Sequence, residues 1–541
     1  MIRDEVEPIV FRPIVFWLGT AAIVAGVLSH VPMFRHAAAM GYRMVGMPMD
    51  GIMIAGMFCI VGGVLAAFYG VLPTGRTAPG LRRPDALHLE LRALDDAHLT
   101  PAHWSLIATL MTAVVVDVMK PATLGFVLPG MIEEYGLDRE VAALFPLTAL
   151  AGTAAGSIAW GLLADRLGRR ATILLSALMF IGTSICGAMP TFAWNVGMCF
   201  LMGLSAGGLL PITFTLIAEI IPSRHRGWVM VLVGGVGTAG GYLAASAGAA
   251  LLEPLFSWRV LWLLGLPTGL ILIVSNRFIP ESPRYLALHG QLAEARRVLA
   301  RFGVVLSTGS DVEHAGVGAI TATKCHAIGD LLRRPFRGLT LGLGLGGLAW
   351  GLVNFGFLLW LPSNLRSLGL NGDITNAVLA KGALMSLPAA LLVTWLYHAW
   401  SSKNTLVLFT AGTAAALLGF VALGAGVAQS TSFLSALVVA LLVASGGVIA
   451  TLLPYSAEIY PLSVRATGAG LIAGASKLGG ILGAGVGISA LVPGLAASAV
   501  VAVVPVAASA LIIGITALET RGRRLEEIHA VPLHPAPVPL D

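Results

Sequence analysis

Long apolar runs separated by short polar segments make up most of the chain. A helix needs about 20 apolar residues to cross the hydrocarbon core of a bilayer. Fourteen stretches meet this requirement: 13–33, 51–72, 104–128, 141–164, 171–189, 194–218, 227–252, 257–278, 338–362, 376–399, 404–427, 433–457, 466–490 and 494–517. The first is too long for a signal peptide and follows acidic residues, so we expect it to be retained. The pattern predicts an all-α, multi-pass membrane protein.

The polar segments between these runs differ in charge between the two sides of the membrane. Arginines gather in segments 161–170 and 279–337, which span counting places on one side, whereas segment 129–140 on the other side is mainly acidic. Basic residues favour the cytoplasmic side of a membrane. We therefore expect both termini to be cytoplasmic.

Composition narrows the class of protein further. The chain has 57% hydrophobic and 11% charged residues, whereas a soluble domain has about 25% charged residues. The net charge of +6 comes from loop residues beside the apolar runs, so we expect a lipid bilayer and no nucleic acid as partner. The four cysteines are scattered, which predicts neither a disulfide framework nor a metal site, and we expect no cofactor. Arginine strongly outnumbers lysine, which indicates a GC-rich bacterial genome, and we expect the protein to lie in a bacterial plasma membrane.

One ten-residue loop, between the apolar runs 141–164 and 171–189, carries an unusual group of charged residues and glycines. Gly161 lets helices approach closely, and Gly168 permits a tight reversal. Asp165 can accept hydrogen bonds from an arginine or from a helix N-terminus. The loop also contains Arg166, Arg169 and Arg170. Arginines alone would indicate only an anchor on the cytoplasmic side.

A second pattern recurs at equal spacing in the two parts of the chain. Ala218–Pro222 reads Ala-Glu-Ile-Ile-Pro, and Ala457–Pro461 reads Ala-Glu-Ile-Tyr-Pro, 239 positions later. In each copy an arginine follows the glutamate by seven positions, which gives the pairs Glu219 with Arg226 and Glu458 with Arg465. Two capped helix ends would be the simpler interpretation. The matching order and spacing favour a duplicated six-span unit, as in transporters whose substrate lies between two repeats.

Loop 161–170, the repeat and the segment Pro280–Leu286 resemble the major facilitator superfamily of transporters, especially its sugar-porter and aromatic-acid:proton symporter branches. The resemblance covers about residues 104–525 and implies two six-helix bundles, at 101–278 and 338–525. It also implies a gate of cytoplasmic ion pairs that includes Asp165, Arg169, Glu219, Arg226, Glu458 and Arg465. The second half departs from the pattern, because its counterpart of the loop, 397–403, keeps one basic residue.

Three segments lie outside the two bundles. Residues 1–100 would form an extra two-span hairpin with a cytoplasmic linker. Residues 279–337 would form a cytoplasmic loop with an amphipathic helix at 291–302, and Ser282-Pro283 is typical of a helix start. Residues 526–541 are rich in proline, and we expect them to be disordered.

Two charged residues lie inside the third apolar run. Charged groups in a bilayer are costly, so Asp117 and Lys120 are candidates for function. Aromatic-acid transporters resemble this segment with Asp-x-x-Asp and a glycine eight residues after the first aspartate. Asp117 and Gly125 keep that spacing, but Lys120 replaces the second carboxylate. Related porters often carry an arginine where Cys199 stands here. A structural ion pair is one interpretation; the other is that Asp117 carries the proton while Lys120 binds an anionic substrate.

The second half offers weaker candidates. Asn354 lies among Trp350, Phe355, Phe357 and Trp360, and an amide among aromatic rings suits a planar substrate. These aromatic residues could equally be packing or interfacial residues. Lys381 could extend towards the membrane surface, and Lys477 could face the pathway or pair with a carboxylate.

These observations predict a secondary active transporter, a proton-coupled symporter of a small organic anion or other metabolite that works as a monomer by alternating access. An exporter or facilitator of the same fold is the alternative within transport. A transporter-like receptor or scaffold, which would bind substrate without flux, is an alternative from another class. No hydrolase, metalloprotease or ATP-binding motif occurs in the sequence, so we expect no enzyme activity.

Overall fold

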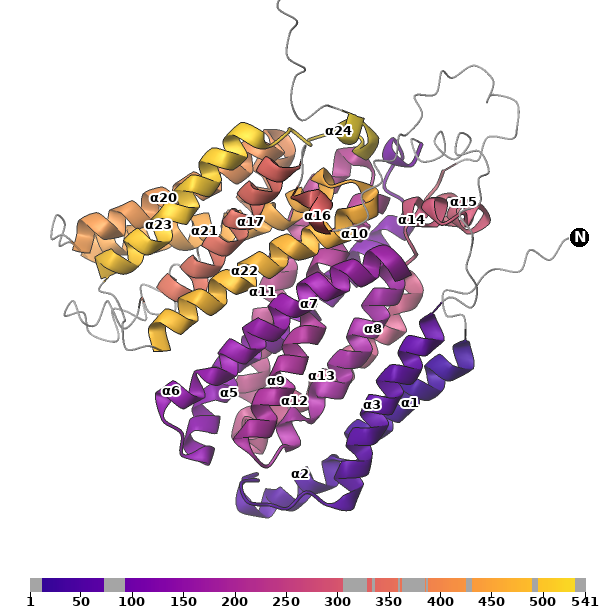
Figure 1. The fold of residues 1–541 in the computed structure, drawn as a ribbon, viewed down its shortest axis with the longest axis vertical. Helices are drawn as coiled ribbons and strands as arrows, with labels where there is room; N and C mark the ends of the chain where they lie inside the picture. Colours follow the sequence, from indigo (N-terminus) through magenta and orange to yellow (C-terminus); the bar gives the residue numbers. More distant parts are fainter. Residues whose placement is uncertain are drawn as a thin grey trace, which may run out of the picture. The chain divides into compact units, whose positions relative to one another are not determined.

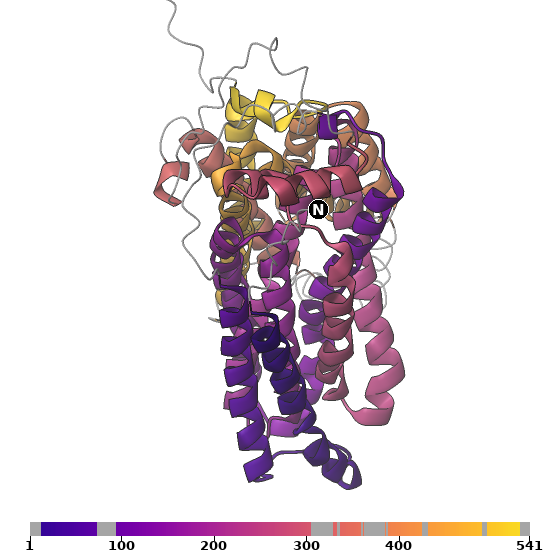
Figure 2. The same cartoon turned by 90° about the vertical axis from the view of Figure 1, so that its right-hand side faces the viewer.

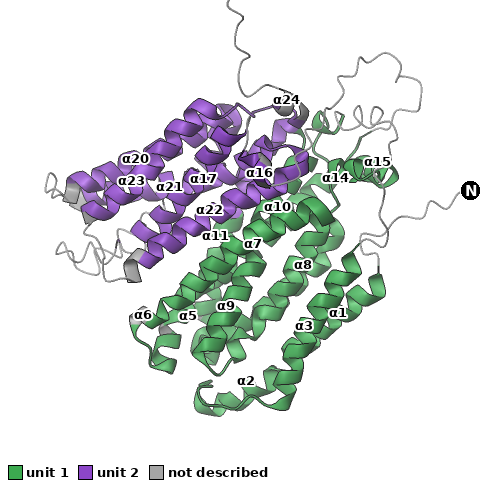
Figure 3. Cartoon of the chain, viewed as in Figure 1, with its two compact units in different colours: residues 1–222, 237–321 green, residues 223–236, 322–541 purple. Residues whose placement is uncertain are grey.

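The structure is a computed structural model. It describes residues 12–72, 93–304, 328–332, 336–358, 361, 385, 388–424, 431–488 and 495–530. The chain divides into two compact units, each described by itself (Figure 3). Unit 1 comprises Met1–Pro222 and Gly237–Thr321, and unit 2 comprises Ser223–Val236 and Ala322–Asp541. Helix α11 (Ser223–Phe256) contributes to both.

The described part of unit 1 is helical (Figure 1). Its hairpin region contains α1 (Pro13–Leu28), α2 (Val31–Ala37), η1 (Ala38–Met40) and α3 (Gly51–Val71). Its bundle contains α5 (Pro101–Tyr135), α6 (Arg139–Ala142), α7 (Leu144–Leu167), α8 (Arg169–Gly182), η2 (Thr183–Ala188), α9 (Phe192–Ala206), α10 (Leu209–Ile220), the later part of α11, α12 (Val260–Leu263), α13 (Gly265–Ser275) and η3 (Asn276–Phe278). Two short helices follow, α14 (Pro283–Leu288) and α15 (Leu292–Arg301).

Helices α1 and α3 lie side by side at the edge of unit 1 (Figures 1 and 2). Their backbones meet at glycines: a Cβ atom on Gly19 would lie 2.6 Å from the carbonyl oxygen of Gly63, and the reverse distance is also 2.6 Å. Only residues without a side chain allow this approach. The pair also packs against α8, where a Cβ atom on Gly182 would lie 2.9 Å from Ile60.

Unit 2 contains the corresponding helices of the second half. They are the start of α11, α16 (Ile328–Leu331), α17 (Arg337–Gly351), the π-helix η4 (Leu352–Leu358), the helical residues 388–399, α20 (Ser402–Gly424), α21 (Thr431–Ile459), η5 (Leu462–Val464), α22 (Arg465–Ile488) and α23 (Leu495–Thr516). Helices α17 and α22 meet at glycines, as α7 and α9 do in unit 1: a Cβ atom on Gly347 would lie 2.8 Å from the carbonyl oxygen of Ile472.

Twelve helices of the described residues are long and apolar enough to cross a membrane. They confirm a multi-pass, all-helical architecture. Helix α22, which is rich in glycine and contains Arg465 and Lys477, is not among the twelve. Residues 376–384 and 386–387, nearly half of the span expected at 376–399, fall outside the described residues. The count of fourteen spans therefore stays a prediction.

The segment after the first bundle has the short helices that the sequence indicates. Ser282 caps α14, accepting a hydrogen bond from the backbone N–H of Tyr285 at 3.2 Å, and Pro283 occupies the first helical position. Helix α15 corresponds to the amphipathic helix and buries Ala295, Val298 and Leu299. At the other end of the chain, α24 (Leu525–Ala530) occupies the first residues of the segment expected to be disordered.

Candidate functional site

The loop between α7 and α8 is built around one buried arginine. Gly168 adopts φ +96°, a conformation that favours glycine, and the chain reverses into α8. The guanidinium of Arg169 lies 3.1 Å from the carboxylate of Asp165 and 2.9 Å from that of Glu219 on α10. Arg169 is 1% exposed and Glu219 is fully buried. The structure thus brings together three predicted gate residues of the first half.

A carboxylate that the sequence analysis did not single out completes this loop. Glu281 accepts hydrogen bonds from the backbone N–H groups of Arg169 (2.8 Å) and Arg170 (3.1 Å), the first residues of α8. These N–H groups have no partner within the helix, and an anion at a helix N-terminus also interacts favourably with the helix dipole. Burial raises the pKa of Glu281, although these hydrogen bonds and Arg169 oppose the shift.

The segment Pro280–Leu286 holds the loop through two more side chains. The hydroxyl of Tyr285 donates to the carbonyl oxygen of Arg166 at 2.8 Å. Arg284 donates to the carbonyl oxygen of Glu219 at 2.7 Å and pairs with Asp95 at 2.6 Å, and both members of this pair are buried. This segment resembles a family motif, but its sequence alone does not reveal these contacts.

The second half holds its repeated glutamate in a different way. Glu458, which is 4% exposed, accepts hydrogen bonds from the hydroxyls of Tyr397 (3.0 Å) and Thr520 (2.6 Å). The positive charge of Arg226, itself 1% exposed, also acts on Glu458. Arg465 is buried and donates from Nε to the carbonyl oxygen of Tyr460 at 3.2 Å. Neutral hydroxyls therefore occupy the position that an arginine has beside Glu219.

The start of α20 resembles the start of α8 in its cap. Glu519 accepts hydrogen bonds from the backbone N–H groups of Ser402 (3.0 Å) and Arg521 (2.9 Å), and from the hydroxyls of Ser401 and Ser402. Burial alone would raise the pKa of Glu519, but the bonds from Ser401, Ser402 and Arg521 outweigh it and lower this pKa. At this cap, the hydroxyls of two serines add to the backbone N–H groups as donors to the glutamate.

Lys120 lies in the interior of the first bundle. Its ammonium donates to the carbonyl oxygen of Phe180 (2.8 Å) and to the hydroxyl of Thr183 (2.9 Å), and it lies 3.9 Å from the centre of the Phe180 ring. The residue is fully buried. The ammonium also interacts electrostatically with the thiols of Cys186 and Cys199. Lys120 is therefore near Cys199, the position at which the family resemblance leads us to expect an arginine.

Asp117 lies one turn earlier on the same helix and is 7% exposed. Within the described parts of the chain, the hydrogen bonds of the Lys120 ammonium go to α8 and η2 and not to Asp117. The ion pair between Asp117 and Lys120 that the spacing suggests is thus not formed in this structure. Because neutral groups accept the hydrogen bonds of the ammonium, Asp117 and Lys120 can have separate roles.

The candidates of the second half form one cluster. The amide of Asn354 in η4 donates to the carbonyl oxygen of Trp350 (3.0 Å) and to the hydroxyl of Ser445 on α21 (2.9 Å). Trp350 packs edge-to-face against Phe355, with centroids 6.2 Å apart, and the Lys477 ammonium lies 5.7 Å from the Trp350 ring centre. These four predicted residues are half-buried. A π-helix such as η4 is frequent at functional sites.

The remaining predicted site residues differ in exposure. Gly161 is buried in α7, Arg166 is exposed, and Arg170 is half-buried. Lys381 lies outside the described residues. No group of three or more His, Cys, Asp or Glu side chains that could hold a metal ion occurs among the residues described.

Comparison with known proteins identifies the family. Residues 106–484, well over half of the chain, match the Major Facilitator Superfamily. The niacin transporter NiaP of Acinetobacter baylyi is 26% identical over 390 residues, which cover 70% of this chain and 85% of the relative. The 4-hydroxybenzoate transporter PcaK of Pseudomonas aeruginosa is 28% identical over 435 residues, which cover 75% of this chain and 91% of the relative.

A solved structure shows the same fold. The proton:xylose symporter XylE, bound to 6-bromo-6-deoxy-D-glucose, superposes with a TM-score of 0.63 at 19% identity and covers 79% of this chain and 98% of its own. The matched family and these relatives are transporters. This agrees with the loop and the repeat found in the sequence. The chain therefore belongs to the Major Facilitator Superfamily and is a secondary transporter rather than an enzyme.

Proposed function

We propose that this transporter is a proton-coupled symporter of small aromatic carboxylates. The named substrates of the relatives, niacin, 4-hydroxybenzoate, benzoate and gallate, share an aromatic ring and a carboxylate. Such a substrate needs a cation for its carboxylate and an apolar, partly aromatic surface for its ring. The described residues include a buried cation, Lys120, and an aromatic cluster around Asn354.

One observation carries this proposal: the ammonium of Lys120 is fully buried with neutral hydrogen-bond partners, close to Cys199. Among the described residues, the hydrogen-bond partners of this buried cation are a neutral carbonyl and a neutral hydroxyl; a buried cation in such surroundings is expensive to maintain, and an anion would stabilise it. In the proposed cycle the substrate carboxylate pairs with Lys120 while Asp117 takes up the proton. The substrate anion and the proton then cross the membrane together, so that no isolated charge is carried across.

The cluster around Asn354 is a candidate for contacts with an aromatic ring. Trp350 and Phe355 offer two ring faces, and Asn354 offers an amide that Ser445 already orients. Lys477, close to the Trp350 ring, is a second cation that a carboxylate could approach. Lys381 is retained as a pathway candidate on its sequence position alone.

The charged clusters around Arg169 and Glu458 would form the cytoplasmic gate. Under the positive-inside rule this end of each unit faces the cytoplasm, together with both chain termini. Breaking and forming ion pairs and hydrogen bonds at this end would alternate access to the substrate. We further propose that the protein works as a monomer in a bacterial plasma membrane, and that α1 and α3 form a two-span hairpin additional to the twelve-helix core.

Uptake into proteoliposomes tests this function. Purified protein is reconstituted, and accumulation of labelled nicotinate, benzoate, 4-hydroxybenzoate and xylose is measured with and without an imposed proton gradient. The proposal predicts gradient-dependent accumulation of at least one aromatic carboxylate and none of xylose. Accumulation of xylose alone, or uptake of a carboxylate that ignores the proton gradient, would contradict it. The Lys120→Met variant should lose carboxylate uptake, whereas Lys120→Arg should keep part of it.

A further inference from the structure

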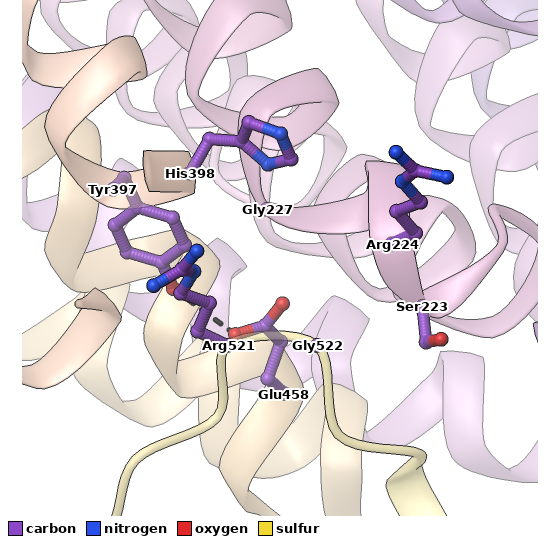
Figure 4. A pocket seen from close by; sticks show the side chains of 8 residues that line it. All are labelled: Ser223, Arg224, Gly227, Tyr397, His398, Glu458, Arg521 and Gly522. Atoms are coloured by element: carbon purple, nitrogen blue, oxygen red, sulfur yellow. Dashed lines mark hydrogen bonds between the residues drawn. The ribbon is translucent and has the colours of Figure 1, made fainter. Parts of the chain in front are cut away.

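A pocket of about 340 Å³ opens on unit 2 near the buried Glu458. Four elements supply its walls: the start of α11, the end of helix 388–399, the end of α21 and the loop after α23. Figure 4 shows the lining side chains, which are Ser223, Arg224, Gly227, Tyr397, His398, Glu458, Arg521 and Gly522. Its volume falls in the range of small-ligand sites, about 300–1,000 Å³.

Three cationic or titratable nitrogen groups meet in this pocket. Arg224 and Arg521 come from different elements, and both act electrostatically on His398, so the three groups are close enough to repel one another. Arg224, His398 and Arg521 are all exposed. Within the residues that the structure describes, neither arginine has a carboxylate within ion-pair distance. Bringing such groups together without a counter-charge is unfavourable unless an anion binds between them.

The one carboxylate in the wall does not serve as that counter-charge. Glu458 is 4% exposed, and its carboxylate accepts from Tyr397 and Thr520. Arg521 uses one guanidinium nitrogen for the carbonyl oxygen of Trp400, at 3.0 Å, which fixes the side chain and leaves further donors. The nearby Glu519 is bound to the two serines and to backbone N–H groups.

The arrangement favours a tetrahedral oxyanion over a planar one. A single arginine can hold a planar carboxylate through two parallel hydrogen bonds. Here the donors come from three separate elements, and the N-terminal turn of α11 adds the partial positive charge of a helix end. Donors that converge from several directions match the four oxygens of a phosphate group.

The position also suits a membrane surface. Trp400 is 48% and Trp395 is 61% exposed, and tryptophans gather where apolar chains give way to lipid headgroups. Because Arg521 is tied to the backbone of Trp400, its guanidinium lies at about that level. A phosphate group could therefore reach the pocket from the aqueous phase or from a lipid headgroup.

We propose that this pocket is a binding site for a phosphate group, held by Arg224 and Arg521 with His398. The site borders Glu458 of the proposed gate but includes none of the residues proposed to contact the carboxylate substrate, and its binding test does not depend on transport. A bound phosphate would hold the first turn of α11 against the loop after α23.

The test uses full-length protein in phosphatidylcholine nanodiscs. Three proteins are compared: wild type, the double variant Arg224→Gln/Arg521→Gln, and Arg523→Gln, which removes an exposed arginine of the same loop outside the pocket. Inorganic phosphate is titrated while the apparent unfolding temperature is followed. In a second arm, nanodiscs containing phosphatidylglycerol are used, and native mass spectrometry measures the lipid retained by each protein.

The proposal expects binding of one probe to weaken about tenfold or more in the double variant and to stay unchanged in Arg523→Gln, since charge-assisted hydrogen bonds are lost. Loss of the inorganic phosphate response identifies a free oxyanion as the ligand, and loss of phosphatidylglycerol retention identifies a lipid headgroup. Equal behaviour of the double variant and wild type with both probes overturns the proposal. If the double variant does not fold, the single variants Arg224→Gln and Arg521→Gln are measured in its place. Binding of both probes to these variants as strong as to the wild type overturns the proposal.

Discussion

Glu281 and Glu519 occupy equivalent positions in the two halves and cap equivalent helices. Each follows the last helix of its half, and each accepts a backbone N–H at the first residue of the third helix, Arg169 at 2.8 Å in one half and Ser402 at 3.0 Å in the other. The two glutamates are 238 positions apart, close to the 239 that separate Glu219 from Glu458. The internal repeat therefore preserves a capping contact even where the loop sequences differ.

The cap at Glu519 should make stability fall in acid. Because its folded-state pKa is lowered, the contribution of Glu519 is present above the unfolded value of about 4.3 and is lost as pH falls through the folded value. Glu519→Gln should cost about 1 kcal/mol at neutral pH and progressively less in acid. Thermal unfolding from pH 7 downwards measures this, and the exposed Glu527→Gln serves as control. A cost that does not change with pH would contradict the assignment.

The cap at Glu281 should show the opposite slope. Burial raises its pKa above the unfolded value, so its contribution is present below about pH 4.3 and is lost as pH rises through the folded value. Relative to wild type, Glu281→Gln should therefore gain stability as pH rises. The difference in apparent unfolding temperature between the two proteins, followed from acid to neutral pH, reports this slope directly. The same slope for Glu281→Gln and Glu519→Gln would show that the two environments do not differ as described.

Removal of Arg169 should destabilise the first unit strongly. Arg169→Gln would take from the buried Glu219 the cation at 2.9 Å, at a cost of about 3–5 kcal/mol. Arg169→Gln/Glu219→Gln should recover part of this loss, because no buried carboxylate is then left behind. Arg166→Gln, which changes an exposed arginine of the same loop, should leave the unfolding temperature nearly unchanged. A double variant as unstable as the sum of the two single variants would rule out direct coupling.

Asn354 should affect substrate affinity and not proton coupling. Asn354→Ala removes the amide that lies between Trp350 and Ser445, and we expect KM for the carboxylate to rise about fivefold, as for the loss of one hydrogen bond. Ser445→Ala, which removes only the hydroxyl that orients the amide, should have a smaller effect of the same sign. Initial uptake rates over a substrate series, measured with a fixed proton gradient, separate KM from kcat. An unchanged KM in Asn354→Ala would exclude it from the binding site.

The fold and one buried ion-pair contact, that of Arg169 with Glu219, could be predicted from the sequence. Hydropathy indicates helices of spanning length, and the pairing of Arg169 with Glu219 follows from motifs that name both residues. The contacts of Glu458 could not be predicted in the same way. Its partners Tyr397 and Thr520 are neutral residues without a motif, and they lie 61 and 62 positions away. The sequence offers no charge complementarity to reveal such hydroxyl contacts.

The interior of the first bundle shows a second limit of sequence reasoning. Spacing along α5 suggests that Lys120 pairs with Asp117, one turn away. The ammonium instead reaches the carbonyl oxygen of Phe180 and the hydroxyl of Thr183, on the segment where α8 ends. A long side chain can cross to a neighbouring helix, and periodicity along one helix cannot reveal the acceptor there. The resemblance to porters that carry an arginine at the position of Cys199 was the better indicator of where the Lys120 ammonium lies.

The most direct test of the proposed mechanism is a comparison of gradient-driven accumulation with exchange in Asp117→Asn. Wild-type and variant proteoliposomes are loaded or challenged with the carboxylate that the wild type accumulates. If Asp117 carries the proton, the variant will fail to accumulate substrate under an imposed proton gradient but will still exchange labelled for unlabelled substrate across the membrane. Accumulation by Asp117→Asn that equals that of the wild type would contradict the mechanism.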